Sequence, residues 1–80
     1  MLFRSLSVEE QGDEFLLMGL RLAEGIDPER YEAIAGKPLD MTRIEALIGD
    51  GLIARTQDGM LRVTSEGFPV LDAVVADLAA

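Results

Sequence analysis

The side chains that could do chemistry in this 80-residue chain are its carboxylates, because the sequence contains no histidine and no cysteine. Acids recur at a spacing of four, as in Glu9 with Asp13 and Glu10 with Glu14, which places each pair on one face of a helix. These acids fall in the exposed first turns of a predicted helix, where negative charge interacts favourably with the helix dipole. We therefore interpret them as solvated charges and not as a general acid and base.

The remaining residue patterns offer no other reactive arrangement. The sequence has no glycine-rich phosphate loop, no metal-ligand spacing and no nucleophile placed beside a base. Without cysteine or histidine, disulfides and thiolate or imidazole ligation are also excluded. We therefore predict no catalytic, cofactor-binding or metal site within the chain. The absence of cysteine fits a reducing compartment, and we expect a cytoplasmic protein.

The length and net charge of the chain limit the number of domains and the kinds of partner it can bind. Fifteen acidic and seven basic residues give a formal net charge of -8, so most of the surface would repel a nucleic acid. No apolar run approaches the ~18 residues of a membrane span, and we expect no membrane partner. We predict one domain over residues 7–80, preceded at 1–6 by a disordered start or a junction with an upstream segment.

The most apolar stretch, residues 13–25, predicts a helix that organises the domain. Ser7 and Glu10 form a capping box, so we expect this helix over residues 8–24, with Gly25 ending it. At about 100° per residue, two adjacent apolar stripes cover a wider arc than one core needs. The residues of these stripes are Phe15, Met18 and Leu22, and beside them Leu16, Leu20 and Ala23.

Leu17 falls outside that arc, in the sector that carries most of the charged residues of the helix. An apolar residue in a charged sector is expected where a helix contacts a neighbouring domain as well as its own core. The alternative is an ordinary exposed leucine. We predict an interdomain interface that includes Leu17 and Arg21, with Leu6 and Phe3 from the N-terminal segment.

Gly12 and Gly19 also lie inside this predicted helix, on its broad apolar face. Each costs about 1 kcal/mol relative to alanine in a helix interior. They indicate either a close approach of another element or tolerated glycines.

Later segments predict three more helices and a hairpin. Asp27 and Asp40 are placed to cap helices over residues 28–35 and 41–49, and a last helix is expected from about residue 67. Asp58-Gly59 predicts a two-residue turn between strands at 52–57 and 60–64. In that register Arg55 lies opposite Arg62, and the face toward the core is made of Leu52, Ala54, Thr56, Leu61 and Val63.

The predicted fold class is α+β and mostly helical. The order helix, short strand at Ile26, helix, helix, β-hairpin, helix is that of a winged-helix-turn-helix domain. A DNA-reading winged helix needs basic or amide side chains on its recognition helix and wing. Here residues 41–49 carry few of them, and Asp58 lies at the tip of the wing. We therefore expect no nucleic-acid partner, with a small DNA-binding regulator or a protein-interaction adaptor as the alternatives.

Several segments also resemble a known family. The string EFLLMGLRL at 14–22 is followed by EGI at 24–26, GLI at 51–53, LRVT at 61–64, EG at 66–67 and VLDAVV at 70–75. Together they resemble the C-terminal domain of the radical-SAM coproporphyrinogen dehydrogenase family, which includes oxygen-independent coproporphyrinogen III oxidases and related heme chaperones. The resemblance covers about residues 7–78, nearly the whole chain.

The resemblance implies that catalysis belongs to an upstream barrel domain, which would hold an iron–sulfur cluster and bind S-adenosylmethionine. None of the cluster-binding residues can be carried over, because they are cysteines and this chain has no cysteine. The implied role of this chain is an accessory domain whose first helix packs on or near the barrel and helps to cover the substrate or heme site. Its only candidate axial heme ligands are a carboxylate, Tyr31 and the methionines Met18, Met41 and Met60, and we interpret these methionines as core residues.

Overall fold

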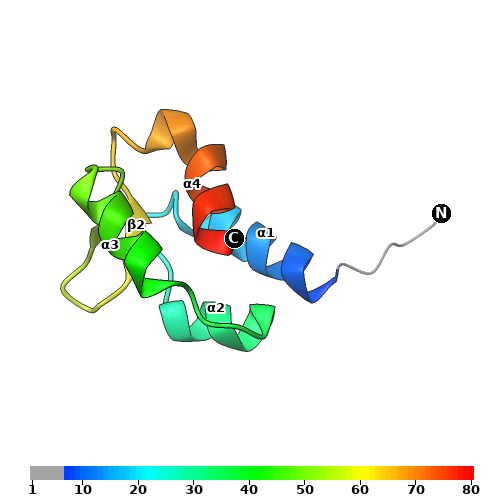
Figure 1. Ribbon diagram of the computed structural model, residues 1–80. Coiled ribbons are helices and arrows are strands. Elements are labelled where there is room, and N and C mark those ends of the chain that lie inside the picture. The colour runs from blue at the N-terminus through cyan, green and yellow to red at the C-terminus, as the bar shows by residue number, and fades with distance from the viewer. Residues whose placement is uncertain (1–6) are drawn as a thin grey trace.

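Helices make up most of the computed structural model, which describes residues 7–80. The expectations for residues 1–6, including Phe3 and Leu6, lie outside the described residues. In chain order the elements are α1 (Val8–Gly19), α2 (Pro28–Ala35), α3 (Met41–Gly49), β1 (Ile53–Arg55), β2 (Leu61–Val63), the short 3-10 helix η1 (Phe68–Val70) and α4 (Leu71–Ala79). Helix α1 packs against α2 and α4, while α3 packs against β1 and α4 (Figure 1). The described part is therefore α+β and mostly helical, with one two-stranded antiparallel sheet.

Helix α1 begins as the sequence predicts but ends earlier. The capping box is present, with the Glu10 amide donating to the Ser7 hydroxyl at 3.1 Å and the Ser7 amide donating to the Glu10 carboxylate at 3.0 Å. The predicted end at residue 24 is wrong, because α1 stops at Gly19. The Leu20 carbonyl, which a longer helix would use internally, accepts the Val63 amide of β2 at 2.9 Å. Pairing with the hairpin therefore ends the helix.

The segment after α1 joins the helix to the sheet. Gly25 was predicted to end this helix, but it lies beyond the end of α1. It adopts a positive φ of 74° and turns the chain toward Ile26. Ile26 forms an antiparallel bridge with Leu61, in which its amide donates to the Leu61 carbonyl at 2.7 Å and its carbonyl accepts the Leu61 amide at 2.8 Å. The expected pairing of Ile26 with the hairpin is confirmed.

The two glycines of α1 mark close packing, as one of the two interpretations predicted. A Cβ at Gly12 would lie 2.8 Å from the Cβ of Ala35 and 3.1 Å from Cε1 of Tyr31, both on α2. A Cβ at Gly19 would collide with the side chain of Ile26. Only a residue without a side chain lets α2 and the Ile26 segment approach α1 this closely.

Helices α2 and α3 have the predicted bounds because their signals are local. The Asp27 side chain accepts the Glu29 amide at 3.0 Å, and the Asp40 side chain accepts the Thr42 amide at 2.8 Å. Gly36, with a φ of 78°, ends α2 in the left-handed conformation that favours glycine. Met41 was expected on the core face of α3 but is 59% exposed, because it occupies the first, solvent-facing position of the helix.

The hairpin register predicted from the sequence is wrong. Arg55 pairs with Leu61 and Ala54 with Arg62, so the two arginines do not face each other. The loop is a turn closed by the Gly59 amide donating to the Thr56 carbonyl, followed by the Thr56 amide donating to the Met60 carbonyl. With Gly59 at a φ of 82°, this is a three-residue loop with a G1 bulge and not a two-residue turn.

This shift by one position exchanges the faces of the first strand. Ile53 is 1% exposed and belongs to the core, whereas the predicted core-facing residues Leu52, Ala54 and Thr56 are only partly buried. On the second strand the prediction for Leu61 and Val63 is confirmed, since both are buried.

The C-terminal region starts with η1, because Pro69 cannot donate an amide to a regular first turn. Helix α4 then buries Leu71, Val74, Val75 and Leu78, whereas Phe68 of η1 is 51% exposed. The largest fully buried side chains come from all four α-helices, the turn after α1 and both strands of the described chain: Leu16, Leu20, Tyr31, Ile44, Ile53, Leu61, Val74 and Leu78.

Candidate interdomain interface

The apolar arc of α1 is divided between the core and the solvent. The stripe of Leu16 and Leu20 is fully buried. The other stripe, Phe15, Met18 and Leu22, was expected to face the core, but Met18 and Leu22 are each 54% exposed and Phe15 is half-buried. We call these three residues the α1 flank. The sequence correctly indicated surplus apolar surface on this segment but assigned it to Leu17.

The α1 flank lines an open pocket of about 570 Å³ together with Ile34 of α2 and Gly19. Gln11 and Glu14 are the polar residues at its border. A second open pocket of about 460 Å³ shares Phe15, Gly19 and Leu22 and extends past Ile26 to Met60. A continuous, mainly apolar surface therefore runs from the middle of α1 to the loop of the hairpin. Contiguous exposed apolar surface of this kind marks interaction sites.

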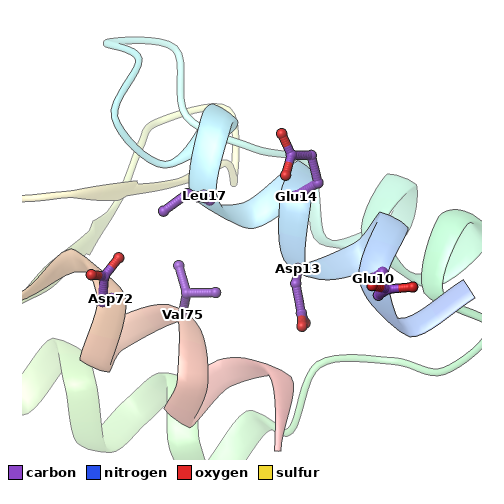
Figure 2. Close-up of a pocket in the computed structure, with 6 residues that line it drawn as sticks. All are labelled: Glu10, Asp13, Glu14, Leu17, Asp72 and Val75. Atoms are coloured by element: carbon purple, nitrogen blue, oxygen red, sulfur yellow. The ribbon is translucent and has the colours of Figure 1, made fainter. Parts of the chain in front are cut away.

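Leu17 lies on a different side of α1, beside α4. Leu17 is half-buried and packs on the core, and it faces Val75 across a shallow pocket of about 310 Å³ (Figure 2). The carboxylate residues that line this pocket are Glu10, Asp13, Glu14 and Asp72. Part of the apolar area of Leu17 is thus covered by its own domain. Its role in an interdomain contact stays a prediction.

Arg21, the only described residue that the prediction groups with Leu17, does not share a helix with it. Because α1 ends at Gly19, Arg21 lies in the turn that follows, exposed and directed to a pocket shared with β2. Phe3 and Leu6 lie outside residues 7–80. The interface of these four residues therefore stays a prediction.

The positions of the glycines could have identified the flank. Gly12 and Gly19 lie on the same side of α1 as Leu16, and close packing of α2 on that side fixes it as the core face. Phe15 and Met18 then fall at the edge of the buried arc. From the sequence, these glycines indicated the close approach of another element, but not which of the two apolar stripes faces the core.

The described residues offer little for catalysis. No group of three or more acidic residues within 7–80 is arranged to hold a metal ion, and no helix in that range is long and apolar enough to cross a membrane. The pKa of Tyr31 is raised above its usual 10.0, first by burial against α1 and then by the negative charge of Asp13. A phenol held in its neutral form is a packing residue here and not a base.

The cations on and around α3 are used within the domain. Nη1 of Arg43 lies 2.8 Å from Oδ1 of Asp77 on α4, and Arg43 also lies 3.9 Å from Asp40. Nη2 of Arg55, from the first strand of the hairpin, lies 3.3 Å from Oε2 of Glu45 on α3. These pairs tie α3 to α4 and to the hairpin.

One family model matches the chain, and it does so over residues 6–70; its description is HemN C-terminal domain. No curated protein and no solved structure gives a significant match. The matched range contains α1, α2, α3, the hairpin and η1, and therefore every residue of the α1 flank. Because this range covers most of the 80 residues, the chain belongs to the HemN C-terminal domain family.

Proposed function

We propose that this chain is the accessory C-terminal domain of a HemN-like protein of porphyrin or heme metabolism, and that it packs against the catalytic barrel of that protein through the α1 flank. Membership of the family supports an accessory role in a coproporphyrinogen oxidase-like parent. The observation that carries the docking part is the exposure of Met18, on the helix that also closes the core, and of Leu22, in the turn that follows it.

Family membership indicates which partner would cover the α1 flank. A C-terminal domain accompanies a domain that precedes it in the parent protein, and that domain is the partner always present at high local concentration. Contacts between domains of one chain are commonly modest in size and partly polar. A half-exposed strip of Phe15, Met18 and Leu22 bordered by Gln11 and Glu14 has the composition expected of such a contact.

Chemistry is assigned to the parent in this proposal. The iron–sulfur cluster and S-adenosylmethionine of a radical-SAM protein would be held by the barrel, and heme would be bound there if the parent is a heme chaperone. Met18 would contribute apolar contact area to the interface and not a ligand to iron, since its thioether lies among apolar neighbours on α1.

We further assign the arrangement of α2, α3, the Ile26 bridge and the hairpin to a winged helix used for packing. Reading DNA would require several free cations on α3 and the hairpin. Arg43 and Arg55 are engaged by Asp77 and Glu45, which leaves Arg62 as the one unpaired cation of these described elements. With a net charge of -8, we expect no DNA affinity tighter than the ~10⁻⁴ to 10⁻⁶ M of non-specific binding. Fluorescence anisotropy with a duplex at two salt concentrations tests this.

The docking proposal is tested by Met18→Asp, with Met41→Asp as a matched control. Both methionines are exposed, 54% and 59%, so neither change should unfold the domain. Titration calorimetry against the separately expressed catalytic domain of the parent should show binding weakened at least about tenfold by Met18→Asp, since a desolvated carboxylate in an apolar contact costs more than 1.4 kcal/mol. Met41→Asp should bind like the wild type.

Circular dichroism and thermal unfolding of both variants provide the folding control. Equal affinity of the two variants for the catalytic domain would contradict docking through the α1 flank. An equal loss in both would show that the contact depends on overall charge and not on this surface.

A further inference from the structure

Two arginines are held side by side where α1 meets the sheet. The Val63 amide of β2 donates to the Leu20 carbonyl at 2.9 Å. This hydrogen bond joins the peptide group between Leu20 and Arg21 to the one between Arg62 and Val63. The two arginines are therefore neighbours because of the backbone, and both line one open pocket of about 400 Å³.

Neither guanidinium has an acidic partner among residues 7–80. Arg43 and Arg55 are in ion pairs, and Lys37 donates to the carbonyl of Ala79 at 2.9 Å. Arg21 and Arg62 make no ion pair or side-chain hydrogen bond with a described residue. In a chain with fifteen acids and seven bases, two adjacent cations without a carboxylate are unexpected. Like charges on neighbouring positions disfavour each other unless a counter-charge is bound.

The remaining lining of this pocket suits an oxyanion with an apolar portion. Thr64 is occupied, since its hydroxyl donates to the Gly51 carbonyl at 2.6 Å and accepts the Gly67 amide at 3.0 Å. Ser65 is exposed beside it, and Phe68 presents an aromatic side chain that is 51% exposed. The pocket thus combines two fork-shaped donors, a hydroxyl and an exposed ring.

We propose that Arg21 and Arg62 form a binding site for an oxyanion, a carboxylate or a phosphate. The planar guanidinium group presents paired N–H donors that match the two oxygens of these groups. The anion belongs either to a small molecule or to an acidic side chain of a partner domain, and the chemistry of recognition is the same for both. This site is separate from the α1 flank, and its test does not depend on docking.

The first experiment uses the isolated chain with citrate and with pyrophosphate as probes. In ¹H–¹⁵N spectra recorded at constant ionic strength against sodium chloride, both probes should shift the signals of residues 20–21 and 62–65 in a saturable manner. Arg21→Gln and Arg62→Gln should each weaken binding about tenfold. Arg30→Gln is the matched control, because Arg30 is also exposed and unpaired among the described residues but lies in the pocket beside Met60.

Thermal unfolding provides a second readout. Citrate should raise the melting temperature of the wild type and of Arg30→Gln more than that of Arg21→Gln or Arg62→Gln, because an anion that binds the folded chain stabilises it only where both arginines can hold it. Shifts of the same size with chloride, or equal affinity in all four proteins, would overturn the proposal.

The source of the anion is decided by competition. If the catalytic domain of the parent displaces citrate from the wild type, and Arg62→Gln but not Arg30→Gln binds that domain more weakly, the natural occupant is a carboxylate of that domain. If citrate remains bound in the presence of the catalytic domain, the site serves a small-molecule oxyanion. Failure of docking through Met18 leaves both titrations of the isolated chain interpretable.

Discussion

Gly12 sets how closely α1 approaches α2. Replacing a helical glycine by alanine normally raises the free energy of unfolding by up to ~1 kcal/mol. At Gly12 the new Cβ would lie 2.8 Å from the Cβ of Ala35, so the two helices would have to move apart at a cost of about 1–3 kcal/mol. We expect Gly12→Ala to destabilise the domain in urea unfolding.

Gly49 gives the matched control for this change. It also lies in a helix, but a Cβ there would meet no atom within 4 Å. Gly49→Ala should raise the free energy of unfolding by about 0.5–1 kcal/mol. Stabilisation of both variants would contradict the close packing of α1 on α2 at Gly12.

Tyr31 makes stability depend on alkaline pH. Its pKa is raised in the folded state by burial and then by Asp13, so folding favours the neutral phenol. This contribution is fully present below the unfolded pKa of about 10 and is lost as the pH rises through the higher folded value. The free energy of unfolding of the wild type should therefore fall above about pH 10 more steeply than that of Tyr31→Phe. Parallel curves for the two proteins would contradict the burial of this phenol.

At the scale of the element, the bounds of a helix could be predicted where the residues that set them lie close together in the sequence. The bounds of α2 and α3 follow from Asp27, Asp40 and Gly36, because a cap and the amide it satisfies are neighbours in sequence. The end of α1 could not be predicted in this way. It depends on the hydrogen bond between Leu20 and Val63, whose partners are more than forty residues apart.

The candidate site was predictable only in part for a related reason. Periodicity showed that the segment holding Phe15, Met18 and Leu22 has more apolar surface than one core requires. Which stripe faces solvent depends on where α2 and α4 pack, and this is decided by tertiary contacts. The proposed oxyanion site was even harder to predict from the sequence, since Arg21 and Arg62 become neighbours only through the pairing of the hairpin with the end of α1.

The hairpin loop gives a prediction at the element scale. Gly59 has a φ of 82° and open space around its Cα, so a substitution there meets conformational strain but no collision. Gly59→Ala should cost about 1–2 kcal/mol, and Gly59→Asn less, because asparagine visits the left-handed region more readily. Urea midpoints for the three proteins measure this. Equal midpoints would contradict the left-handed conformation of Gly59.

At the scale of the whole molecule, the domain separates stability from interaction. One face of α1 closes the core with Leu16 and Leu20, and the adjacent α1 flank stays partly exposed, which supports the proposed docking. The ion pairs of Arg43 and Arg55 hold α3 and the hairpin to the rest of the domain. An 80-residue domain has little core to spare, so an exposed apolar strip on its central helix is best explained by a contact outside this fold.

The most direct measurement of that claim is a footprint of the bound domain. A ¹⁵N-labelled chain is titrated with the unlabelled catalytic domain of its parent protein, and amide shifts and hydrogen exchange are followed at each residue. We predict the largest changes at Phe15, Met18 and Leu22, with Asp58 and Gly59 at the hairpin tip unchanged. A complex that perturbs α3 and the hairpin tip while leaving the α1 flank unchanged would contradict this account.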